Sequence, residues 1–416
     1  MKYKWLIVGA LMLALLVLCV AMVGILWATA GFAQTEGLRL RMFSADTVSA
    51  EADEEQRFTV SGPAELAVTN VVGDVTVTGG GGDEIVVKAH KTAWGATQSE
   101  ANAALAGLQI SMTQAGDKVI VTVQQPEEVT VVGTSRSDSV DFTIAVPAET
   151  AVTARADFGD VALSGTTGKV DLQTKSGKIG VEAVSGEIIL ESDFGNVTLE
   201  DAQAVEVGVA SKSGAITLRR VEAEGTISLS SDFGSVTFTT GRAASLTLEA
   251  KSGEVKLADL TVKGAVKVHS DFGQLTLEQV AGEAYDLTTN SGAVTVDGAR
   301  GPVIIHSDFG NVELRGGEDV ALDLRTKSGG ITFSGTLGEG PHRVETDFGS
   351  IWLALPESAA LTLDLKTDFG KVKSDLPVTL SGEFSDEHWQ GTTNGGGDSL
   401  TVRTKNGNIT LVTLNP

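Results

Sequence analysis

Two tripeptides recur along this chain, and each is familiar from nucleotide chemistry. Asp-Phe-Gly, which protein kinases use to hold Mg²⁺, occurs seven times. A catalytic aspartate is needed once, and the chain lacks both the glycine-rich phosphate loop and the His-Arg-Asp segment of kinases. Lys-Ser-Gly lies between the copies of Asp-Phe-Gly, without the G-x-x-x-x-G-K-[ST] frame of a phosphate loop. Both tripeptides are therefore predicted to be structural.

Two histidines would share a metal ion only if they lay side by side. His269 and His306 each precede a repeat aspartate by two residues, so they are expected in one column with Thr288 between them. Two strand spacings are about 9.6 Å, which is too far for one ion with ligand bonds of about 2 Å. No metal site is predicted from this pair.

Two glycine-rich loops lie beside acidic residues. Gly79–Gly82 precede Asp83 and Glu84, and Gly395–Gly397 precede Asp398. Loop carbonyls and carboxylates are ligands that Ca²⁺ accepts, but the calcium-binding nonapeptide G-G-x-G-x-D-x-U-x is absent. Glycine turns account for both loops, and calcium binding by either is left open.

Sugar chemistry would need a local cluster of acids or isolated aromatic platforms. Polysaccharide-cleaving enzymes use paired carboxylates, whereas the acids here follow the repeat evenly. Trp94, Trp352 and Trp389 have rings that stack on sugars, yet isolated aromatics of this kind are more often core or cap residues. We predict no catalytic residue, no cofactor site and no metal site, and the sequence does not identify ligand-binding residues.

The tripeptides mark a repeat of about 19 residues. Apolar and polar residues alternate on both sides of each glycine, as in Asn196–Leu199, which is typical of half-buried strands. Each repeat is therefore predicted to contain a strand, a glycine corner, a second strand and a second turn, often with glycine, as at Gly225, Gly264 and Gly301. The tripeptides begin at residues 157, 175, 193, 212, 232, 251, 271, 290, 308, 327, 347 and 368.

Charge distinguishes a rung of 19 residues from one of 39. In the longer rung every repeat aspartate would stack on another aspartate, about 4.8 Å away, and the column would repel itself. In the shorter rung Asp193 lies between Lys175 and Lys212, so neighbouring charges attract, and Phe194 lies beside serines. The sequence predicts the 19-residue rung, with the tripeptides in one column of a continuous solenoid over residues 157–376.

The N-terminal segment predicts export. Lys2 and Lys4 precede an apolar run over residues 6–28, which at 23 residues is long enough to span a bilayer. Positive charge before the run places the following chain outside the cytoplasm. Residues 1–35 are therefore a signal peptide or a transmembrane signal anchor, and cleavage is left open. The chain is expected in the cell envelope, secreted or anchored to the cytoplasmic membrane by residues 6–28.

The remainder is predicted to be a capped solenoid. Its one helix is expected over Thr97–Leu108, where Ala101, Ala104, Leu105 and Leu108 share a face. The predicted segments are an acidic flexible stalk over 36–57, irregular rungs and a cap with the helix over 58–150, the regular solenoid over 151–376, and a C-terminal rung with a glycine-rich cap loop over 377–416.

Composition limits the partners. The chain has 54 Asp and Glu against 31 Lys and Arg, a net charge of −23. Nucleic acid and anionic lipid headgroups need basic surfaces, so neither is predicted as a direct partner. The membrane is contacted only through the N-terminal segment. Cys19, the one cysteine, lies in the apolar run, so the body is held together without disulfides.

Several segments resemble the bacterial putative-adhesin family. They are the opening VSGPAELAVTNVVGDVTVTG, the repeated SDFGNVTLE and KSGAITL, and the closing LTVRTKNGNITLV. The resemblance covers about residues 58–414. It implies an all-β envelope protein with a single-stranded, right-handed parallel β-helix, and it supplies no catalytic residues.

Three functions remain open at this point. Export, a long repetitive fold, an acidic surface and no reaction centre favour a non-enzymatic extracytoplasmic scaffold, an adhesin or surface-binding protein of the bacterial cell envelope. Its partner would be a cell-surface polymer or an envelope protein. The alternatives are a polysaccharide-active β-helix enzyme and an accessory protein of envelope stress or signalling. The oligomeric state is not predicted.

Overall fold

A computed structural model describes residues 47–124, 137–381 and 385–414. The chain divides into two compact units, Met1–Thr47 and Val48–Pro416, and all described secondary structure lies in the second. The predicted signal peptide or anchor over 1–35 lies outside the described residues. Within the described ranges, no helix has the length and apolar character needed to cross a membrane.

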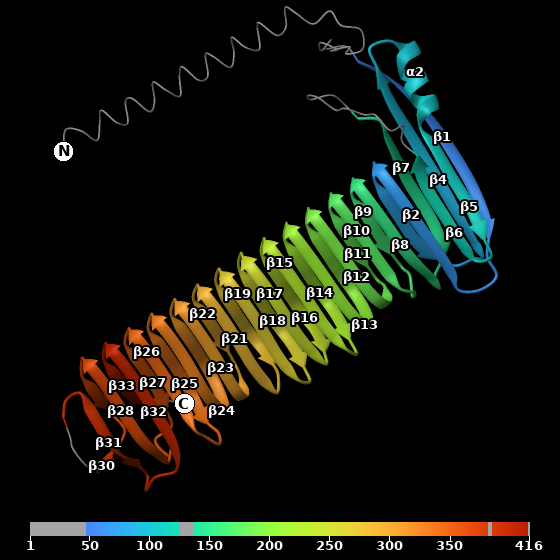
Figure 1. Cartoon of the computed structure of the whole chain (residues 1–416). Helices are drawn as coiled ribbons and strands as arrows, with labels where there is room; N and C mark the ends of the chain where they lie inside the picture. Colours follow the sequence, from blue (N-terminus) through green and yellow to red (C-terminus); the bar gives the residue numbers. More distant parts are fainter. Residues whose placement is uncertain (1–46, 125–136, 382–384, 415–416) are drawn as a thin grey trace, which may run out of the picture. The chain divides into compact units, whose positions relative to one another are not determined.

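The second unit is a β-solenoid with one helix, α2 (Gln98–Gly107) (Figure 1). Its N-terminal strands are β1 (Val48–Thr59), β2 (Ala64–Val72), β3 (Val75–Gly80), β4 (Glu84–Gly95), β5 (Gln109–Ala115), β6 (Lys118–Gln124) and β7 (Ser139–Pro147). The regular rungs contain β8 (Thr150–Phe158), β9 (Val161–Ser164), β10 (Val170–Ser176), β11 (Ile179–Glu182), β12 (Ser185–Phe194), β13 (Val197–Ser213), β14 (Ile216–Ala223), β15 (Thr226–Phe233), β16 (Val236–Ala243), β17 (Ser245–Ser252), β18 (Val255–Val262), β19 (Ala265–Phe272), β20 (Leu275–Ala281), β21 (Ala284–Ser291), β22 (Val294–Asp297), β23 (Arg300–Phe309), β24 (Val312–Ser328) and β25 (Ile331–Leu337). The C-terminal strands are β26 (His342–Phe348), β27 (Ile351–Leu355), β28 (Leu361–Phe369), β29 (Val372–Ser374), β30 (Thr379–Leu380), β31 (His388–Thr393), β32 (Asp398–Asn406) and β33 (Ile409–Thr413).

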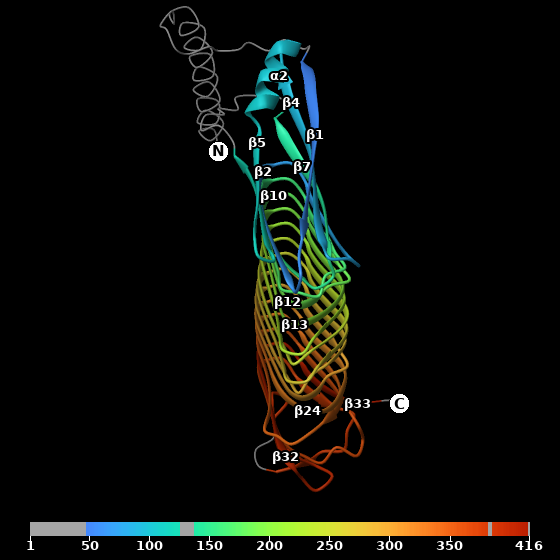
Figure 2. The same ribbon diagram turned by 90° about the vertical axis from the view of Figure 1, so that its right-hand side faces the viewer.

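The strands on either side of each tripeptide glycine form two parallel ladders, which enclose the core (Figure 2). Strand β10 pairs with β8 and β12 in one ladder, while β11 pairs with β9 and β13 in the other. Alternate residues point inward, as Val170 and Leu172 do in β10, and both are fully buried. The alternation of apolar residues in the sequence therefore fixes which side of each strand meets the core.

The register confirms the 19-residue rung. Ser176 is paired with Phe158 on one side and with Phe194 on the other, so unlike tripeptides are neighbours. The same relation holds further along, where Ser252 lies between Phe233 and Phe272. The all-β solenoid class and the single short helix near its N-terminal end are also as predicted.

The corner glycines are required by close stacking of the rungs. Gly234 has a φ of +156°, and a Cβ at this position would lie 2.1 Å from the carbonyl oxygen of Gly214 in the neighbouring rung. Both the backbone conformation and the lack of space exclude larger residues.

Each rung has a further corner that the sequence did not reveal. Residues such as Asp201, Arg220 and Asp259 adopt φ angles of 51° to 55° there, although they are not glycine. Gly225 and Gly264, which were expected to mark the second turn, lie in the turn that follows, and neither has a positive φ. After this corner each rung has a short third side, such as Ala202–Ala204, which pairs with its equivalent in the next rung. The chain then returns to the ladder of strands that precede the tripeptide glycines.

The N-terminal rungs are not stacked in the order of the sequence. Strands β2 and β3 lie between the rung formed by β6 and β7 and the rung formed by β8 and β9. In Figure 1 the blue β2 accordingly lies next to the green β8. Antiparallel strands continue the ladders beyond this point, because β5 pairs with β6, and β4 pairs with β7 and β1. They cover the edge of the outermost rung, formed by β6 and β7, which would otherwise pair with other chains.

The predicted flexible stalk over 36–57 is wrong for its second half. Residues from Val48 onward form β1, and each residue of β1 is paired with one in β4. Its charges contributed to the incorrect expectation, but they are matched across the strands, as in the ion pair between Lys91 and Glu54. The first residues of that segment, 36–46, lie outside the described part.

The helix confirms the prediction over Thr97–Leu108. The hydroxyl of Thr97 accepts a hydrogen bond from the Glu100 backbone amide, which caps the N-terminus of α2. Ala101 is buried, and Leu105 packs against the core, so the helix is attached beside β4 and β1 through its small apolar face.

At the C-terminal end, the prediction of a continuous solenoid over 157–376 is wrong in its last step. The rung of β32 and β33 lies between the rung of β26 and β27 and the rung of β28 and β29. Asp347 therefore meets Lys405 and not the next aspartate in the sequence, Asp368. The inserted rung preserves the alternation of charge, and β31 then covers the last ladder as an antiparallel strand.

Candidate functional site: an exposed phenylalanine row

One edge of the solenoid carries a row of exposed phenylalanines. Their exposed fractions range from 56% to 75%, whereas Phe142, Phe238 and Phe333 are fully buried in the core. We call the following residues the phenylalanine row: Phe158, Phe194, Phe233, Phe272, Phe309, Phe348 and Phe369. A row of exposed aromatic rings along one edge is a candidate interaction site.

The row lies outside because the strand alternation ends at the corner. Ser192 points inward and is buried, Asp193 is half-buried, and Phe194 is exposed, just before the chain turns at Gly195. The ring is therefore placed on the outer side of the bend. In the neighbouring rungs the same position holds Ser176 and Ser213. Large and small side chains alternate along the edge, with about 9.6 Å between successive rings.

Buried hydroxyl groups hold the corners that carry the row. The residue directly before the tripeptide is a serine or threonine in most rungs. In seven of the described rungs its hydroxyl donates to the corner carbonyl of a neighbouring rung. The hydroxyl of Ser231 donates within its own rung, and the buried hydroxyls of Ser270, Thr289 and Ser307 have no hydrogen-bond partner in the described part of the chain. Thr346 Oγ1 lies 2.9 Å from the carbonyl oxygen of Gly329, and Ser192 Oγ lies 3.2 Å from that of Gly177. The recurrent Ser or Thr was visible in the sequence, but its role was not recognised.

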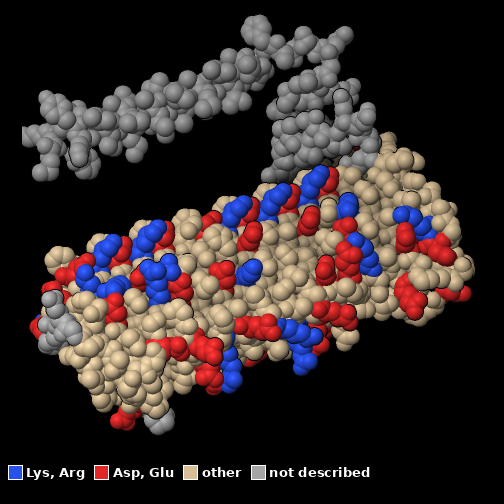
Figure 3. All heavy atoms as spheres, turned by 60° about the horizontal axis from the view of Figure 1, so that its bottom comes forward, with Lys and Arg blue, Asp and Glu red and all other residues tan. Residues whose placement is uncertain are grey.

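A ladder of ion pairs runs beside the phenylalanine row. The first residues of the tripeptides, which are Asp, Lys or Asn, form a charged column along this edge. Each lysine of the column lies 2.6 to 2.9 Å from the aspartate of an adjacent rung. The hydrogen bond and the charge of Asp193 raise the pKa of Lys212, so this lysine stays charged. Figure 3 shows blue and red groups together at intervals along this edge. The pairs are Lys175–Asp157, Lys212–Asp193, Lys251–Asp232, Lys327–Asp308 and Lys405–Asp347.

One rung replaces the lysine with a neutral donor. Asn290 donates its side-chain amide to Asp271 at 2.7 Å. The column therefore contains seven aspartates, five lysines and one asparagine, a net charge of −2 against −23 for the chain. This column is nearly neutral, whereas the chain as a whole is acidic.

Two open grooves lie elsewhere on the surface. One, of about 620 Å³, follows the outer turns and is lined by residues that include Gln203, Val205 and Arg242. The other, of about 570 Å³, contains Arg325, Arg343 and Arg403. All three arginines are already paired with carboxylates, so the second groove does not present free positive charge to an anion. The pairs are Arg325–Asp323, Arg343–Glu345 and Arg403–Asp364.

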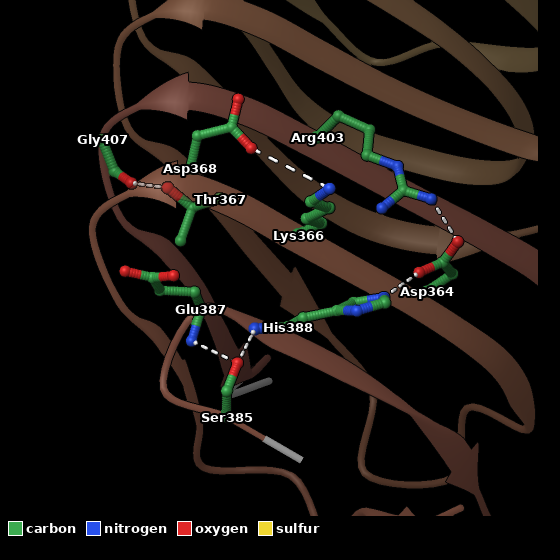
Figure 4. A network of polar contacts seen from close by, with 9 residues as sticks. All are labelled: Asp364, Lys366, Thr367, Asp368, Ser385, Glu387, His388, Arg403 and Gly407. Carbon is green, nitrogen blue, oxygen red and sulfur yellow. Dashed lines mark hydrogen bonds and ion pairs between the residues drawn. The ribbon is translucent and has the colours of Figure 1, made fainter. Parts of the chain in front are cut away.

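A polar cluster at the C-terminal end contains serine, histidine and aspartate but does not form a catalytic triad. His388 Nε2 lies 2.9 Å from Asp364 Oδ1, and Figure 4 shows the ring turned away from Ser385. Ser385 Oγ instead accepts hydrogen bonds from the backbone amides of Glu387 and His388. A nucleophilic hydroxyl must reach the histidine ring, and that of Ser385 does not. The contact between His388 and Asp364 instead attaches β31 to β28.

The histidine pair is arranged as the sequence predicted. Thr288 pairs with His269 on one side and His306 on the other, so the two rings are two rungs apart. His269 contacts Asp271, while His306 lies near Asp323. Among residues 47–124, 137–381 and 385–414, no group of three or more His, Cys, Asp or Glu side chains is placed to hold a metal ion.

The other candidates from the sequence are dispersed. Gly79 and Gly80 end β3, and Gly395 lies in the turn before β32. Trp94 belongs to β4, Trp352 is 40% exposed on β27, and Trp389 packs against the core from β31. The tryptophans do not form a shared aromatic platform. Sequence analysis missed the phenylalanine row because Phe was assigned only to packing between rungs, although its spacing was plain.

The rungs, their glycine corners and the absence of a helical layer in the described part define a capped parallel β-solenoid. The chain belongs to the Toastrack DUF4097 family, which matches residues 64–240 and 230–412. This agrees with the resemblance that the repeated segments predicted.

Two solved structures are also similar. A putative cell adhesion protein from Clostridium sporogenes has 10% identity and a TM-score of 0.16, with 87% of this chain and 100% of that chain covered. A putative adhesin from Bacteroides fragilis has 12% identity and a TM-score of 0.25, with 89% and 98% covered. Comparison with curated proteins finds none that matches.

Proposed function

We propose that this protein is a non-enzymatic scaffold of the bacterial cell envelope, which attaches to another surface through the phenylalanine row. The observation that carries the proposal is the row itself, seven rings that are 56% to 75% exposed. Leaving this much aromatic surface in water is unfavourable, and burial against a partner recovers the cost.

The neighbouring ion pairs suit a binding surface. Their charges are mutually compensated, so a partner does not meet the repulsion expected from a chain of net charge −23. The rungs that carry the row are joined by continuous backbone ladders. A surface built on strands keeps its rings in fixed positions, which lowers the entropy cost of binding.

Location outside the cytoplasm forms part of the proposal. It rests on the apolar run over residues 6–28 with Lys2 and Lys4 before it. The alternative of a polysaccharide-active enzyme gains no support from a specific arrangement, since the histidine cluster of Figure 4 is engaged in packing β31.

Adhesion of cells that produce the full chain tests the function. We expect such cells to attach to cells or isolated envelopes, and the variant Phe233→Ser/Phe309→Ser to attach much less. Serine occupies the equivalent position in alternate rungs, so these substitutions are compatible with the fold. Val205→Ser is the matched control, because Val205 is 54% exposed but lies away from the row.

Two outcomes would contradict the proposal. Equal attachment by the double variant and the wild type would show that the row is not the binding surface. Release of reducing sugars from envelope polysaccharide by the wild-type protein would support the enzyme alternative instead.

A further inference from the structure

We infer that the partner of the phenylalanine row is a second copy of this chain, bound edge to edge and antiparallel. This inference rests on the proposed function and names the partner of the same surface. Two properties of this edge are self-complementary: the alternating size of the side chains in the row and the alternating charge in the column beside it. The area that two copies would bury is a third, separate argument.

Side-chain size alternates with a period of two rungs. Between Phe233 and Phe272 lies Ser252, which leaves a gap about 9.6 Å long between the rings. A ring from a second copy that enters this gap lies about 4.8 Å from each neighbour, within the range of about 4.5–7 Å that aromatic pairs prefer. The two rows would therefore interdigitate and form one continuous stack of rings.

Charge alternates with the same period, and this favours the antiparallel arrangement. A two-fold axis across the rows, placed midway between two rungs, sets each phenylalanine against a serine of the other copy. The same operation keeps the charged column on the same side, so each lysine faces an aspartate. A parallel two-fold axis moves the charged columns to opposite sides and loses this match.

The buried area is sufficient for a stable complex. One phenylalanine buries about 150–250 Å², and six rings with exposed fractions of 61% to 75% offer roughly 600 to 1,000 Å² per copy. A standard protein interface buries about 800 Å² on each partner. Full burial of the six rings would thus supply most or all of an interface of this size.

The exposed fractions of the rings at the two ends of the row indicate between which rungs the two-fold axis lies. An axis between the rungs of Phe272 and Ser291 covers Phe369, which is 75% exposed, and leaves out Phe158, which is 56% exposed. Asp271 then faces Asn290 of the second copy, next to the axis. Every column lysine faces an aspartate in this register, for example Lys251 and Asp308.

The antiparallel pair also fits attachment between cells. It places the N-terminal ends of the two solenoids at opposite ends of the pair. Two chains anchored through residues 6–28 in facing cells would approach in this orientation. The inference therefore predicts homophilic adhesion.

Cysteine crosslinking on intact cells tests the arrangement. The full chain is produced with Cys19→Ser, which removes its one cysteine. Ser291 lies one rung, about 4.8 Å, from its counterpart in the antiparallel pair, whereas Ser176 lies eleven rungs, about 53 Å, away. We expect Ser291→Cys to give disulfide-linked dimers and Ser176→Cys to give at least tenfold fewer.

Two crosslinking results would contradict the inference. Both serines lie one rung from their counterparts in a parallel pair shifted by one rung. Equal crosslinking by Ser176→Cys and Ser291→Cys would therefore overturn the antiparallel arrangement. Absence of dimers with either cysteine, while cells still adhere, would overturn self-association.

Mixed cell populations separate this inference from the proposed function. Labelled cells that produce the chain are mixed with cells that produce it or lack it. We expect aggregates only between producing cells, with about tenfold less aggregation when both populations carry Phe233→Ser/Phe309→Ser. Attachment to cells that lack the chain would overturn the inference but leave the proposed function intact. Failure to attach to any cell or envelope would overturn the proposed function itself.

Discussion

Reversing one charge in the column of tripeptide residues tests most directly which rungs are neighbours. Lys251 lies 2.8 Å from Asp232 in one neighbouring rung, and the other neighbouring rung carries Asp271. Lys251→Glu removes this pair and places three acids in successive rungs. Both partners are partly exposed, so the lost pair is worth about 0.2–1 kcal/mol. Two new acid–acid contacts add about 1 kcal/mol each in a water-like environment.

The free energy of unfolding should therefore fall by roughly 2–3 kcal/mol, which lowers the melting temperature by a few degrees. Thermal unfolding followed by circular dichroism measures the change. Lys251→Gln is the control, because it loses the pair without adding repulsion and should lose less stability. Since the Debye length shortens from about 10 Å at 0.1 M salt to about 3 Å at 1 M, sodium chloride should reduce the difference between the two variants.

A second substitution sharpens the test. Asp271→Lys in the Lys251→Glu background restores an opposite pair, and its other neighbour is the neutral Asn290. Asp232→Lys would instead place the new lysine beside Lys212. We expect Asp271→Lys to restore more stability than Asp232→Lys. If neither salt nor Asp271→Lys changes the melting temperature of Lys251→Glu, these residues are not neighbours and the 19-residue rung is wrong.

Three further perturbations concern the corners and the buried histidine. Gly234→Val should destabilise the fold by more than about 3 kcal/mol through strain and overlap with Gly214, whereas Ser235→Val, at an exposed position, should change little; equal melting temperatures would contradict the corner geometry. Thr346→Ala leaves the carbonyl of Gly329 without its side-chain donor, and we expect a loss of about 1 kcal/mol in urea unfolding, against no change if the hydroxyl is unimportant. Burial lowers the pKa of His342, so the unfolded chain binds the proton more tightly and stability should fall as the pH drops below about 6.5. His342→Gln should weaken this acid dependence of the melting temperature; an unchanged pH profile would exclude His342 as its source.

The two solenoid ends show why neighbouring rungs are not always neighbours in sequence. An open first or last rung exposes unpaired backbone groups along its whole edge. The fold avoids this by placing β2 between β6 and β8, and β32 between β26 and β28. The rungs that come first and last in the sequence are therefore each enclosed between two others. The outer rungs are then covered by antiparallel strands, β5 and β31.

The regular part of the molecule was predictable from local patterns in the sequence. A period of two in the apolar residues defines which side of a strand faces the core, and this property is local. The alternation of Asp and Lys fixed the rung length, because neighbours in a ladder are close enough for charge to matter. The alternation broke at the consecutive aspartates Asp347 and Asp368, where the sequence analysis still predicted a continuous solenoid, and the structure places Lys405 between them.

The order of the end rungs, by contrast, became visible only in the folded chain, as did the pairing of β1 and the exposure of the phenylalanine row. Which strand lies beside which depends on the paths of long excursions, such as residues 375–397, and no local pattern encodes such a path. At the corner the strand alternation stops, so periodicity did not show that Phe194 faces water. Long-range pairing and the outer side of a bend are properties of the stacked rungs, because each exists only when a neighbouring rung is in place.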